Sequence, residues 1–310
     1  MPDLDYDDAA IQPYSQNPFV RVLKIPISIS FYAFREARRF VSRLLGRRTP
    51  GVAVAICYHQ VFAEDRARFA RQMDHLLRWT VPLRADHSEL LLDGARCAIV
   101  TADDGWVSFV QNALPELRCR NIPVAIFVIT GRMGDSMGEA ADRIMSEQQL
   151  LELQPDIARG LLIIGSHTST HARVTTLDES EALRELTGSR ARLEQLLDRE
   201  VDLFCFPFGS SSAETIELCR AACYRRTFLS IPSPALSDPH EFVTGRVRVD
   251  PSDWLVEFHL KLMGAYEWVP VAIMLKRRLL EALHMRGTSR DSVAKVRESN
   301  SVVPKIASES

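Results

Sequence analysis

Four residues that can bind a metal ion stand where buried strands are expected to end. Asp103 and Asp104 follow the apolar run CAIV and the dipeptide TA, and His167 follows LLIIGS, with His171 four residues later. Two imidazoles at this spacing can reach one cation, and a carboxylate from a neighbouring strand end adds a third ligand while one position stays open for water. The residue types therefore predict a catalytic metal site, in which one aspartate binds the ion and the other acts on the bound water.

Each of these features also has an ordinary explanation. Asp-Asp-Gly is common in surface turns, and a single histidine at a strand end is more often a hydrogen-bonded bystander than a ligand. However, two further predicted strands end in Tyr58-His59 and in Pro207-Phe208-Gly209. Ligands of α/β sheets bind at the carboxyl ends of the strands, so several polar groups on one rim favour a functional site over a set of unrelated turns.

The elements that would position these residues alternate along the chain. Apolar runs predict strands within 51–59, 96–105, 122–130, 160–167 and 201–209. Helical spacing separates them at 63–79, 107–121, 146–155, 177–200 and 212–224, and Asp178 with Glu181 resembles a helix-capping box. Such alternation is typical of βα units on a parallel sheet buried on both faces, either open or closed into a barrel.

Three motifs, in this order, resemble the leading signatures of the polysaccharide deacetylases. These are the carbohydrate esterases of family 4, which include the nodulation-type chitooligosaccharide deacetylases. The motifs are TADDG at 101–105, HTSTH at 167–171 and FPFG at 206–209. The segments ALPELRCRNIPVAIFVITG and CYHQV are also similar to the family, so the resemblance covers roughly residues 51–265. It implies a distorted (β/α) barrel, with seven strands, which suits the α/β pattern.

The resemblance also implies a role for each motif residue. The ligands of a divalent cation, usually zinc in this family, would be Asp104, His167 and His171. Asp103 would be the general base, and the backbone N–H of Phe208, next to Pro207, would help to bind the oxyanion. The implied reaction is the hydrolysis of an N-acetyl group of an amino sugar in a glycan by metal-activated water.

Two positions depart from the family pattern and leave roles open. Cys205 stands where the third motif often has an arginine that orients the base, and the segment TGRVRVD offers Arg246 or Arg248 instead, of which we favour Arg246. The family's general acid is a histidine, for which VEFHLKL gives only a loose match at His259. His59, at a strand end on the same rim, is the competing candidate.

A strongly basic segment precedes the first strand. Residues 20–48 hold eight basic residues against one acid, and from Phe31 to Gly46 the apolar residues follow helical spacing. This amphipathic helix packs on the domain with a solvated basic face, covers an open side of the barrel, or anchors the protein on an anionic membrane. We expect residues 1–50 to be a disordered start with this helix, 51–270 the barrel domain, and 271–310 a C-terminal helix and disordered tail.

Composition limits the compartment and the partners. The net charge of −2 predicts no nucleic-acid partner. None of the six cysteines belongs to a C-x-x-C pair, and the start MPDLDYDDAA is acidic, unlike a signal peptide. No apolar stretch reaches the roughly 20 residues that span a bilayer. We therefore expect a cytoplasmic protein, with peripheral contact at the inner membrane face as an extension, acting on an oligosaccharide, a polysaccharide or a lipid-linked sugar.

Two other functions stay open on the sequence alone. A sugar-binding relic would keep the fold without catalysis, and another barrel hydrolase would cleave a different amide, such as a formamide. Metal binding together with acetate release distinguishes the deacetylase from both.

Overall fold

The computed structural model describes residues 18–136, 142–238, 240–276 and 278. The chain divides into two units, Met1–Trp268 and Val269–Ser310. Every strand and helix named below lies in the first unit, and residues 269–276 of the second are helical. The expected disordered start and most of the expected tail lie outside the described residues.

The strands and helices alternate through the first unit, as the sequence pattern predicts. The strands are β1 (Val52–Tyr58), β2 (Val81–Leu83), β3 (Arg96–Ala102), β4 (Val124–Val128), β5 (Leu162–Ser166), β6 (Leu203–Cys205), β7 (Arg226–Leu229) and β8 (Val243–Arg248). The helices are α1 (Pro18–Leu44), α2 (Arg66–Trp79), α3 (Leu114–Arg120), α4 (Glu147–Leu151), α5 (Gln154–Ala158), α6 (Glu179–Leu197), α7 (Ala213–Ala221) and α8 (Leu255–Leu262).

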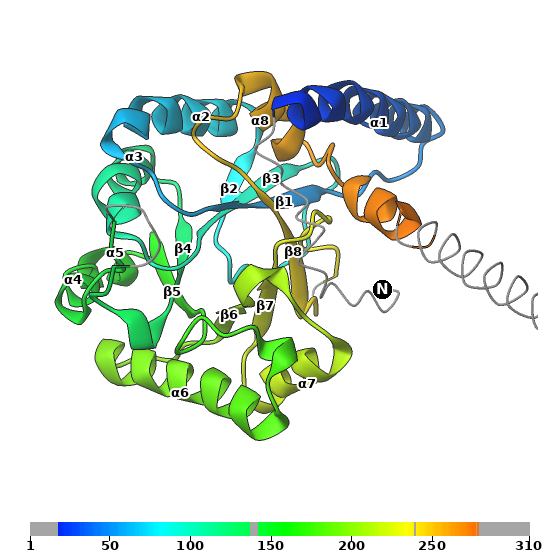
Figure 1. Ribbon diagram of the computed structural model, residues 1–310. Coiled ribbons are helices and arrows are strands. Elements are labelled where there is room, and N and C mark those ends of the chain that lie inside the picture. Colours follow the sequence, from blue (N-terminus) through cyan, green and yellow to red (C-terminus); the bar gives the residue numbers. More distant parts are fainter. Residues whose placement is uncertain (1–17, 137–141, 239, 277, 279–310) are drawn as a thin grey trace, which may run out of the picture. The chain divides into compact units, whose positions relative to one another are not determined.

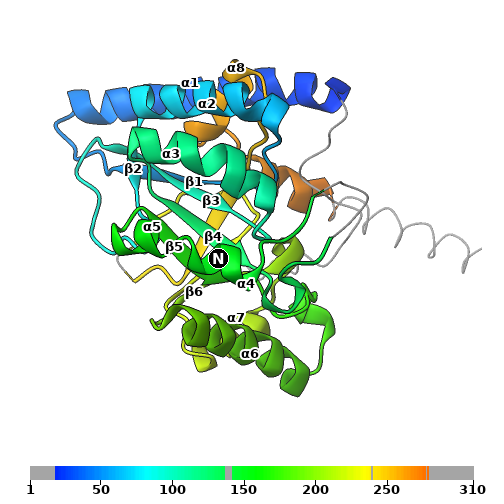
Figure 2. The same cartoon turned by 90° about the vertical axis from the view of Figure 1, so that its left-hand side faces the viewer.

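Within the described residues, seven parallel strands close into a barrel surrounded by helices (Figures 1 and 2). The order β1-β8-β7-β6-β5-β4-β3 returns to β1, because β1 pairs with β3 over residues 52–58 and 96–102. The short strand β2 pairs with residues 97–99 of β3, on the edge that β4 continues along residues 100–102. The seven-stranded (β/α) barrel with an N-terminal helix is therefore confirmed.

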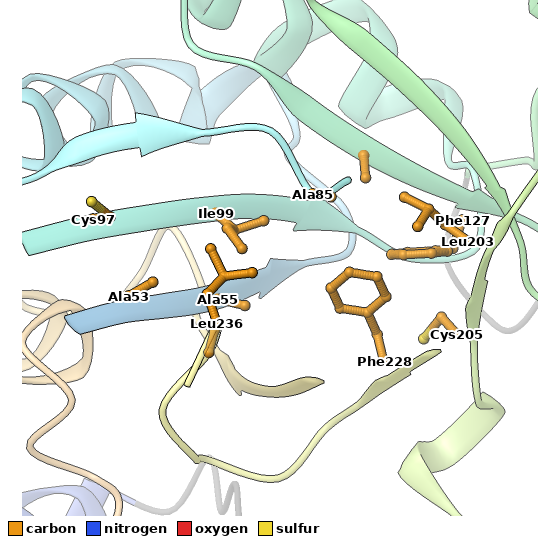
Figure 3. Packing of buried hydrophobic residues seen from close by; sticks show 12 residues of the cluster. Ala53, Ala55, Ala85, Cys97, Ile99, Phe127, Leu203, Cys205, Phe228 and Leu236 are labelled. Atoms are coloured by element: carbon orange, nitrogen blue, oxygen red, sulfur yellow. The ribbon is translucent and has the colours of Figure 1, made fainter. Parts of the chain in front are cut away.

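Small side chains and two phenylalanines fill the barrel interior (Figure 3). The rings of Phe127 and Phe228 lie 5.1 Å apart. A Cβ atom at Gly165 of β5 would lie 2.5 Å from the ring of Phe127, so this ring requires a glycine on the neighbouring strand. The remaining interior positions are alternate strand residues of modest size, among them Ala53, Ala55, Cys97, Ile99, Ala125 and Cys205. This packing closes the interior below the rim formed by the carboxyl ends of the strands.

Local signals explain some elements and miss others. The predicted capping box at the start of α6 is confirmed, since the Asp178 side chain accepts a hydrogen bond from the backbone N–H of Glu181 at 2.8 Å. The apolar patterns did not indicate β2, β7 or β8. The first has only three residues, and the other two contain arginines, which interrupt the apolar run that marks a buried strand.

The basic helix α1 lies against α8 with some of its charged residues turned inward. Arg21 donates to Glu257 at 2.6 Å, and Arg35 donates to Glu267 at 3.0 Å. The prediction of a solvated basic face is therefore wrong for these arginines, because each forms an ion pair with an acid on the barrel side. In the part of the chain that the structure describes, none of the helices has both the length and the apolar character needed to cross a membrane.

Candidate active site

The four residues singled out as ligands and base meet at the carboxyl ends of β3 and β5. Asp103 and Asp104 directly follow β3, and His167 directly follows β5. The backbone N–H of His167 donates to the carbonyl of Val128, the last residue of β4, which lies between those two strands. Asp104 and His171 have φ angles of 70° and 66°, a left-handed conformation that is uncommon outside glycine and that concentrates at functional sites.

Three of these side chains converge on one point. Oδ1 of Asp104 lies 3.4 Å from Nε2 of His167 and 3.4 Å from Nε2 of His171. This oxygen is buried and has no hydrogen-bond partner among the described residues, whereas Oδ2 accepts a bond from the Trp106 indole at 2.8 Å. A buried carboxylate oxygen without a donor is costly unless a cation covers it.

The donor set fits a divalent cation. One ligand atom from each of Asp104, His167 and His171 lies within 4.8 Å of the others. Nδ1 of His167 lies 2.8 Å from the carbonyl oxygen of Cys205, a bond that fixes the ring with Nε2 directed at the aspartate. One carboxylate and two imidazoles from a rigid rim are the three-ligand pattern of catalytic metal sites.

Neighbouring charges set the protonation of this group. Burial opposes ionisation of Asp104, but the nearby His167 imidazole lowers the pKa of the carboxyl below its usual range. Burial would lower the pKa of His167, yet the adjacent Asp104 and the charge of Asp103 raise it. Burial and the neighbouring His167 lower the pKa of His171 to about 4, so its imidazole is neutral near pH 7 and able to bind a cation.

Asp103 is held by Arg246, which rises from β8 through the barrel interior. Nη1 and Nη2 of Arg246 donate to the two carboxylate oxygens, each at 2.7 Å. The guanidinium is fully buried, and its Cζ lies 5.4 Å and 5.8 Å from the ring centres of Phe127 and Phe228. Burial opposes ionisation of Asp103, but the Arg246 charge holds the pKa of the carboxyl well below its usual range, so Asp103 stays ionised.

Cys205 and Arg246 are direct neighbours. The Arg246 Nη2 lies 2.8 Å from the Cys205 Sγ, so the smaller side chain of Cys205 leaves space in which the guanidinium from β8 reaches the aspartate. The favoured substitute for the missing motif arginine is thus in contact with Asp103. Its role in orienting a base stays a prediction.

Two further sequence candidates line the rim. His59 follows β1, and one of its ring nitrogens lies within 4.8 Å of a carboxylate oxygen of Asp103. Phe208, after Pro207, has a φ of 59° and an exposed ring, whose centre lies 4.7 Å from that of His171. The structure therefore brings Phe208 and His59 to the same end of the barrel as the aspartates.

The structure does not bring His259 to this rim group. His259 lies on α8, where its Nδ1 is 2.9 Å from Nε2 of His75 on α2. Its ring also contacts Trp79 and Tyr32, with centres 4.8 Å and 6.3 Å away. The histidine of the loose match VEFHLKL therefore lies in a helix layer outside the barrel, where it contacts other aromatic side chains and not the aspartates of the rim.

Comparisons with known proteins agree with this geometry. Residues 93–227 match the family model of the polysaccharide deacetylases. This part of the barrel is therefore similar to the polysaccharide deacetylases. A Bacillus subtilis (strain 168) protein named as a polysaccharide deacetylase, YxkH, is 26% identical over 156 residues, which are 50% of this chain and 52% of the relative. The chain thus spans about half the length of that curated relative.

Solved structures share the fold of this chain. IcaB from Ammonifex degensii is 25% identical, with a TM-score of 0.59, and the match covers 69% of this chain and 98% of that one. The Streptococcus pyogenes deacetylase PplD, solved in complex with acetate, is 18% identical with a TM-score of 0.57, and the match covers 69% of this chain and 99% of that one. The second likeness shows the fold alone.

Two contacts of the candidate site were missed in the sequence. Trp106 donates to Asp104, and Cys57 donates through its thiol to Asp103 Oδ2 at 3.2 Å. An apolar-looking cysteine gives no sequence signal for such a contact. For Trp106 a signal existed, since a buried indole N–H needs an acceptor and Asp104 is two residues away.

Proposed function

We propose that this chain is a metal-dependent hydrolase that removes the N-acetyl group from an N-acetylated amino sugar in a glycan. The observation that carries the proposal is the orphan Oδ1 of Asp104, buried between the Nε2 atoms of His167 and His171 in a polysaccharide deacetylase barrel. These three residues would hold the cation, which we take to be zinc because of the two imidazole ligands. When bound, it would lower the pKa of a water and polarise the acetamide carbonyl.

Asp103 and Arg246 would handle the proton of the attacking water. Arg246 keeps the pKa of Asp103 low and fixes both carboxylate oxygens, so Asp103 is available as a proton acceptor throughout the neutral range. The backbone N–H of Phe208 would donate to the developing oxyanion, since the left-handed backbone at this residue turns the chain at the rim beside His171.

Protonation of the departing amine is assigned to His59 rather than to His259. His59 lies at the rim close to Asp103, and its Nδ1 is buried without a hydrogen-bond partner among the described residues. His259 is engaged with His75 in another layer. The products would be acetate and a free amino sugar, which together account for one water added across the amide bond.

The compartment is proposed to be the cytoplasm. All six cysteines are free in the structure, and four of them are buried, as expected where thiols stay reduced. The substrate would then be an oligosaccharide, a polysaccharide or a lipid-linked sugar that is available inside the cell.

Acetate release from N-acetylated sugars tests the proposal. Purified protein treated with a chelator should lose the activity, and added zinc should restore it. A chain that binds zinc but releases no acetate from any sugar of a broad panel would be a binding protein. Release of formate instead of acetate would assign a different amide substrate.

A further inference from the structure

Helix α1 turns a polar face, rather than its apolar face, toward the barrel. Its charged face points toward the barrel, where Arg21 bonds to Glu257, Arg35 to Glu267, and Arg39 to the carbonyl of Pro50. Ser28, in the middle of this inner face, is fully buried and accepts a bond from Trp268 at 2.9 Å. A surface helix of a globular protein normally buries its apolar stripe instead.

The apolar side chains of α1 consequently face outward. Leu23, Ile27, Phe34, Val41 and Leu44, which we call the apolar stripe, recur at spacings of three, four and seven residues and are between 42% and 70% exposed. Val22, Ile29 and Phe40 border the stripe and are exposed to a similar degree, as is Leu45 just beyond the helix. A continuous exposed apolar surface of this length marks an interaction site.

Most exposed charges near the apolar stripe are basic, although Arg48 lies 3.9 Å from the half-exposed Asp93. Glu36, the only acid in the basic segment, is bound to Arg96 at 2.6 Å. Arg38, Arg47 and Arg48 are exposed, and the Arg48 side chain is 92% exposed. The outer side of the helix therefore combines apolar side chains with arginines. This combination complements an anionic lipid surface better than a protein surface without acidic residues.

The exposed apolar surface continues onto the neighbouring helices. Figures 1 and 2 show α1, α8 and α2 in one layer along the same side of the barrel, and α8 contacts both of the others. Next to α1, the Arg21 guanidinium lies 5.1 Å from the ring centre of Trp254, which is 46% exposed. Leu255, Val256 and Trp79 are exposed as well. Tryptophan is enriched where proteins meet the boundary of a bilayer.

One end of this layer lies at the active-site rim. The Arg21 side chain donates to the carbonyl of Ser252, in the loop that follows β8, and the same loop begins where Val249 pairs with Cys57 beside Asp103. The other end of α1 lies near the start of β1, since Arg39 donates to Pro50. The helix thus runs along the barrel from the substrate end to the opposite end.

We propose that the apolar stripe of α1, together with the exposed residues of α8, docks the protein on an anionic lipid bilayer. Docked in this way, the barrel lies along the membrane, and the edge of the rim formed by the loop after β8 is nearest to the membrane surface. Resting on the deacetylase function proposed above, this position selects the substrate class: an N-acetylated sugar carried on a membrane lipid.

Vesicle binding tests the docking surface without using activity. The full chain should co-sediment with vesicles containing phosphatidylglycerol, should bind much less to pure phosphatidylcholine vesicles, and should be released by high salt. The variant Phe34→Glu/Leu44→Glu should weaken binding about tenfold or more, because it places two charges in the apolar stripe. The matched control is Leu151→Glu, at a leucine of α4 that is 37% exposed, and it should bind like the parent chain.

Three results would overturn the docking proposal. One is equal binding of the Phe34→Glu/Leu44→Glu variant and the parent chain to the anionic vesicles. The second is a concentration-dependent dimer in light scattering that the same variant abolishes, which would assign the apolar stripe to a second copy of the chain. The third is a clear loss of thermal stability in that variant, since these side chains would then be covered within the chain.

The substrate class is tested with one sugar in two forms. Acetate release is compared for an N-acetylated sugar on a lipid in anionic vesicles and for the same sugar free in solution. Phe34→Glu/Leu44→Glu should slow only the reaction in vesicles, and equal slowing of both would contradict the proposal. If neither form releases acetate while vesicle binding holds, the deacetylase function fails and the docking surface stands.

Discussion

Adjacent aspartates have different partners at this rim, and the difference separates their roles. Asp104 faces two imidazoles and keeps one buried oxygen without a donor, whereas both oxygens of Asp103 are bound by Arg246. A carboxylate whose oxygens are already bound to an arginine is a poor metal ligand. The orphan oxygen of its neighbour is a good one.

The two amide variants should therefore behave differently. Asp104→Asn should lose bound zinc, because a neutral amide replaces the anionic ligand. Asp103→Asn should retain the metal but lower kcat by about a hundredfold or more with little change in KM. Zinc content by atomic emission and initial rates of acetate release check both. Exchanged phenotypes would reverse the roles of the two aspartates. If neither variant changed zinc content or rate, Asp103 and Asp104 would only form a turn.

Arg246 should be a major stabilising residue as part of an ion pair, and its loss should be costly. In Arg246→Met the fully buried Asp103 loses its counter-charge, and removal of one partner of such a pair costs about 3–5 kcal/mol. Arg225→Met is the matched control, since its partner Asp202 lies at a similar distance, 2.6 Å, but the arginine is half exposed, a setting worth about 0–1 kcal/mol. The free energy of unfolding in urea measures both. Equal losses would mean that Asp103 finds another partner.

The sequence predicts the chemistry of the rim better than the support of each residue. Asp103, Asp104, His167 and His171 could be found because each directly follows, or lies close to, an apolar strand run. The bond between Arg246 and Asp103 joins residues 143 positions apart, and nothing local in the chain indicates which of Arg246 and Arg248 points inward. His259 lies outside the rim group for a related reason, because a short motif match cannot say which face of α8 meets the barrel.

At the scale of elements, strand pattern and packing carry different information. Strands β1 and β3 to β6 were visible as apolar runs, while β7 and β8 were hidden by their arginines. The orientation of α1 was also hidden, because its partners Glu257 and Glu267 lie more than two hundred residues away. Periodicity defines the two faces of a helix, but tertiary contacts decide which face is buried.

Close packing between β4 and β5 gives a test at this scale. Gly165→Ala would place a Cβ 2.5 Å from the Phe127 ring and 3.0 Å from the backbone oxygen of Leu203, so it should destabilise the barrel by about 1–3 kcal/mol. Gly188→Ala, inside α6 with its nearest neighbour at 3.6 Å, should instead stabilise by about 0.5–1 kcal/mol. Thermal unfolding of both variants checks the contrast. A gain of stability in Gly165→Ala would contradict the close packing of Gly165 against Phe127.

Across the first unit, the layer of α1, α2 and α8 joins two features that the strands alone would not bring together. It carries the outward apolar stripe, and it holds the histidine pair of His75 and His259 between its helices. Only one proton can sit between Nε2 of His75 and Nδ1 of His259. The layer is therefore expected to respond to pH in the range where histidine titrates.

The last prediction concerns the stability of this layer below neutral pH. Burial, the His259 ring and Arg78 lower the pKa of His75, while burial and Arg96 lower that of His259, each from an ordinary value of 6.5. Because the unfolded chain binds these protons first, the contribution of the pair to stability is present above pH 6.5 and is lost as the pH falls toward the folded-state values.

The histidine contribution can be isolated with a double variant. The metal-free parent chain should lose unfolding free energy from pH 7 to pH 5 more steeply than His75→Gln/His259→Gln, in which neither ring can titrate. Urea denaturation at a series of pH values measures both slopes, and the other buried histidines contribute equally to each. Parallel slopes would show that the pair titrates alike in folded and unfolded chains. A steeper slope in the double variant would reverse the sign, and would mean that the folded layer stabilises a protonated histidine.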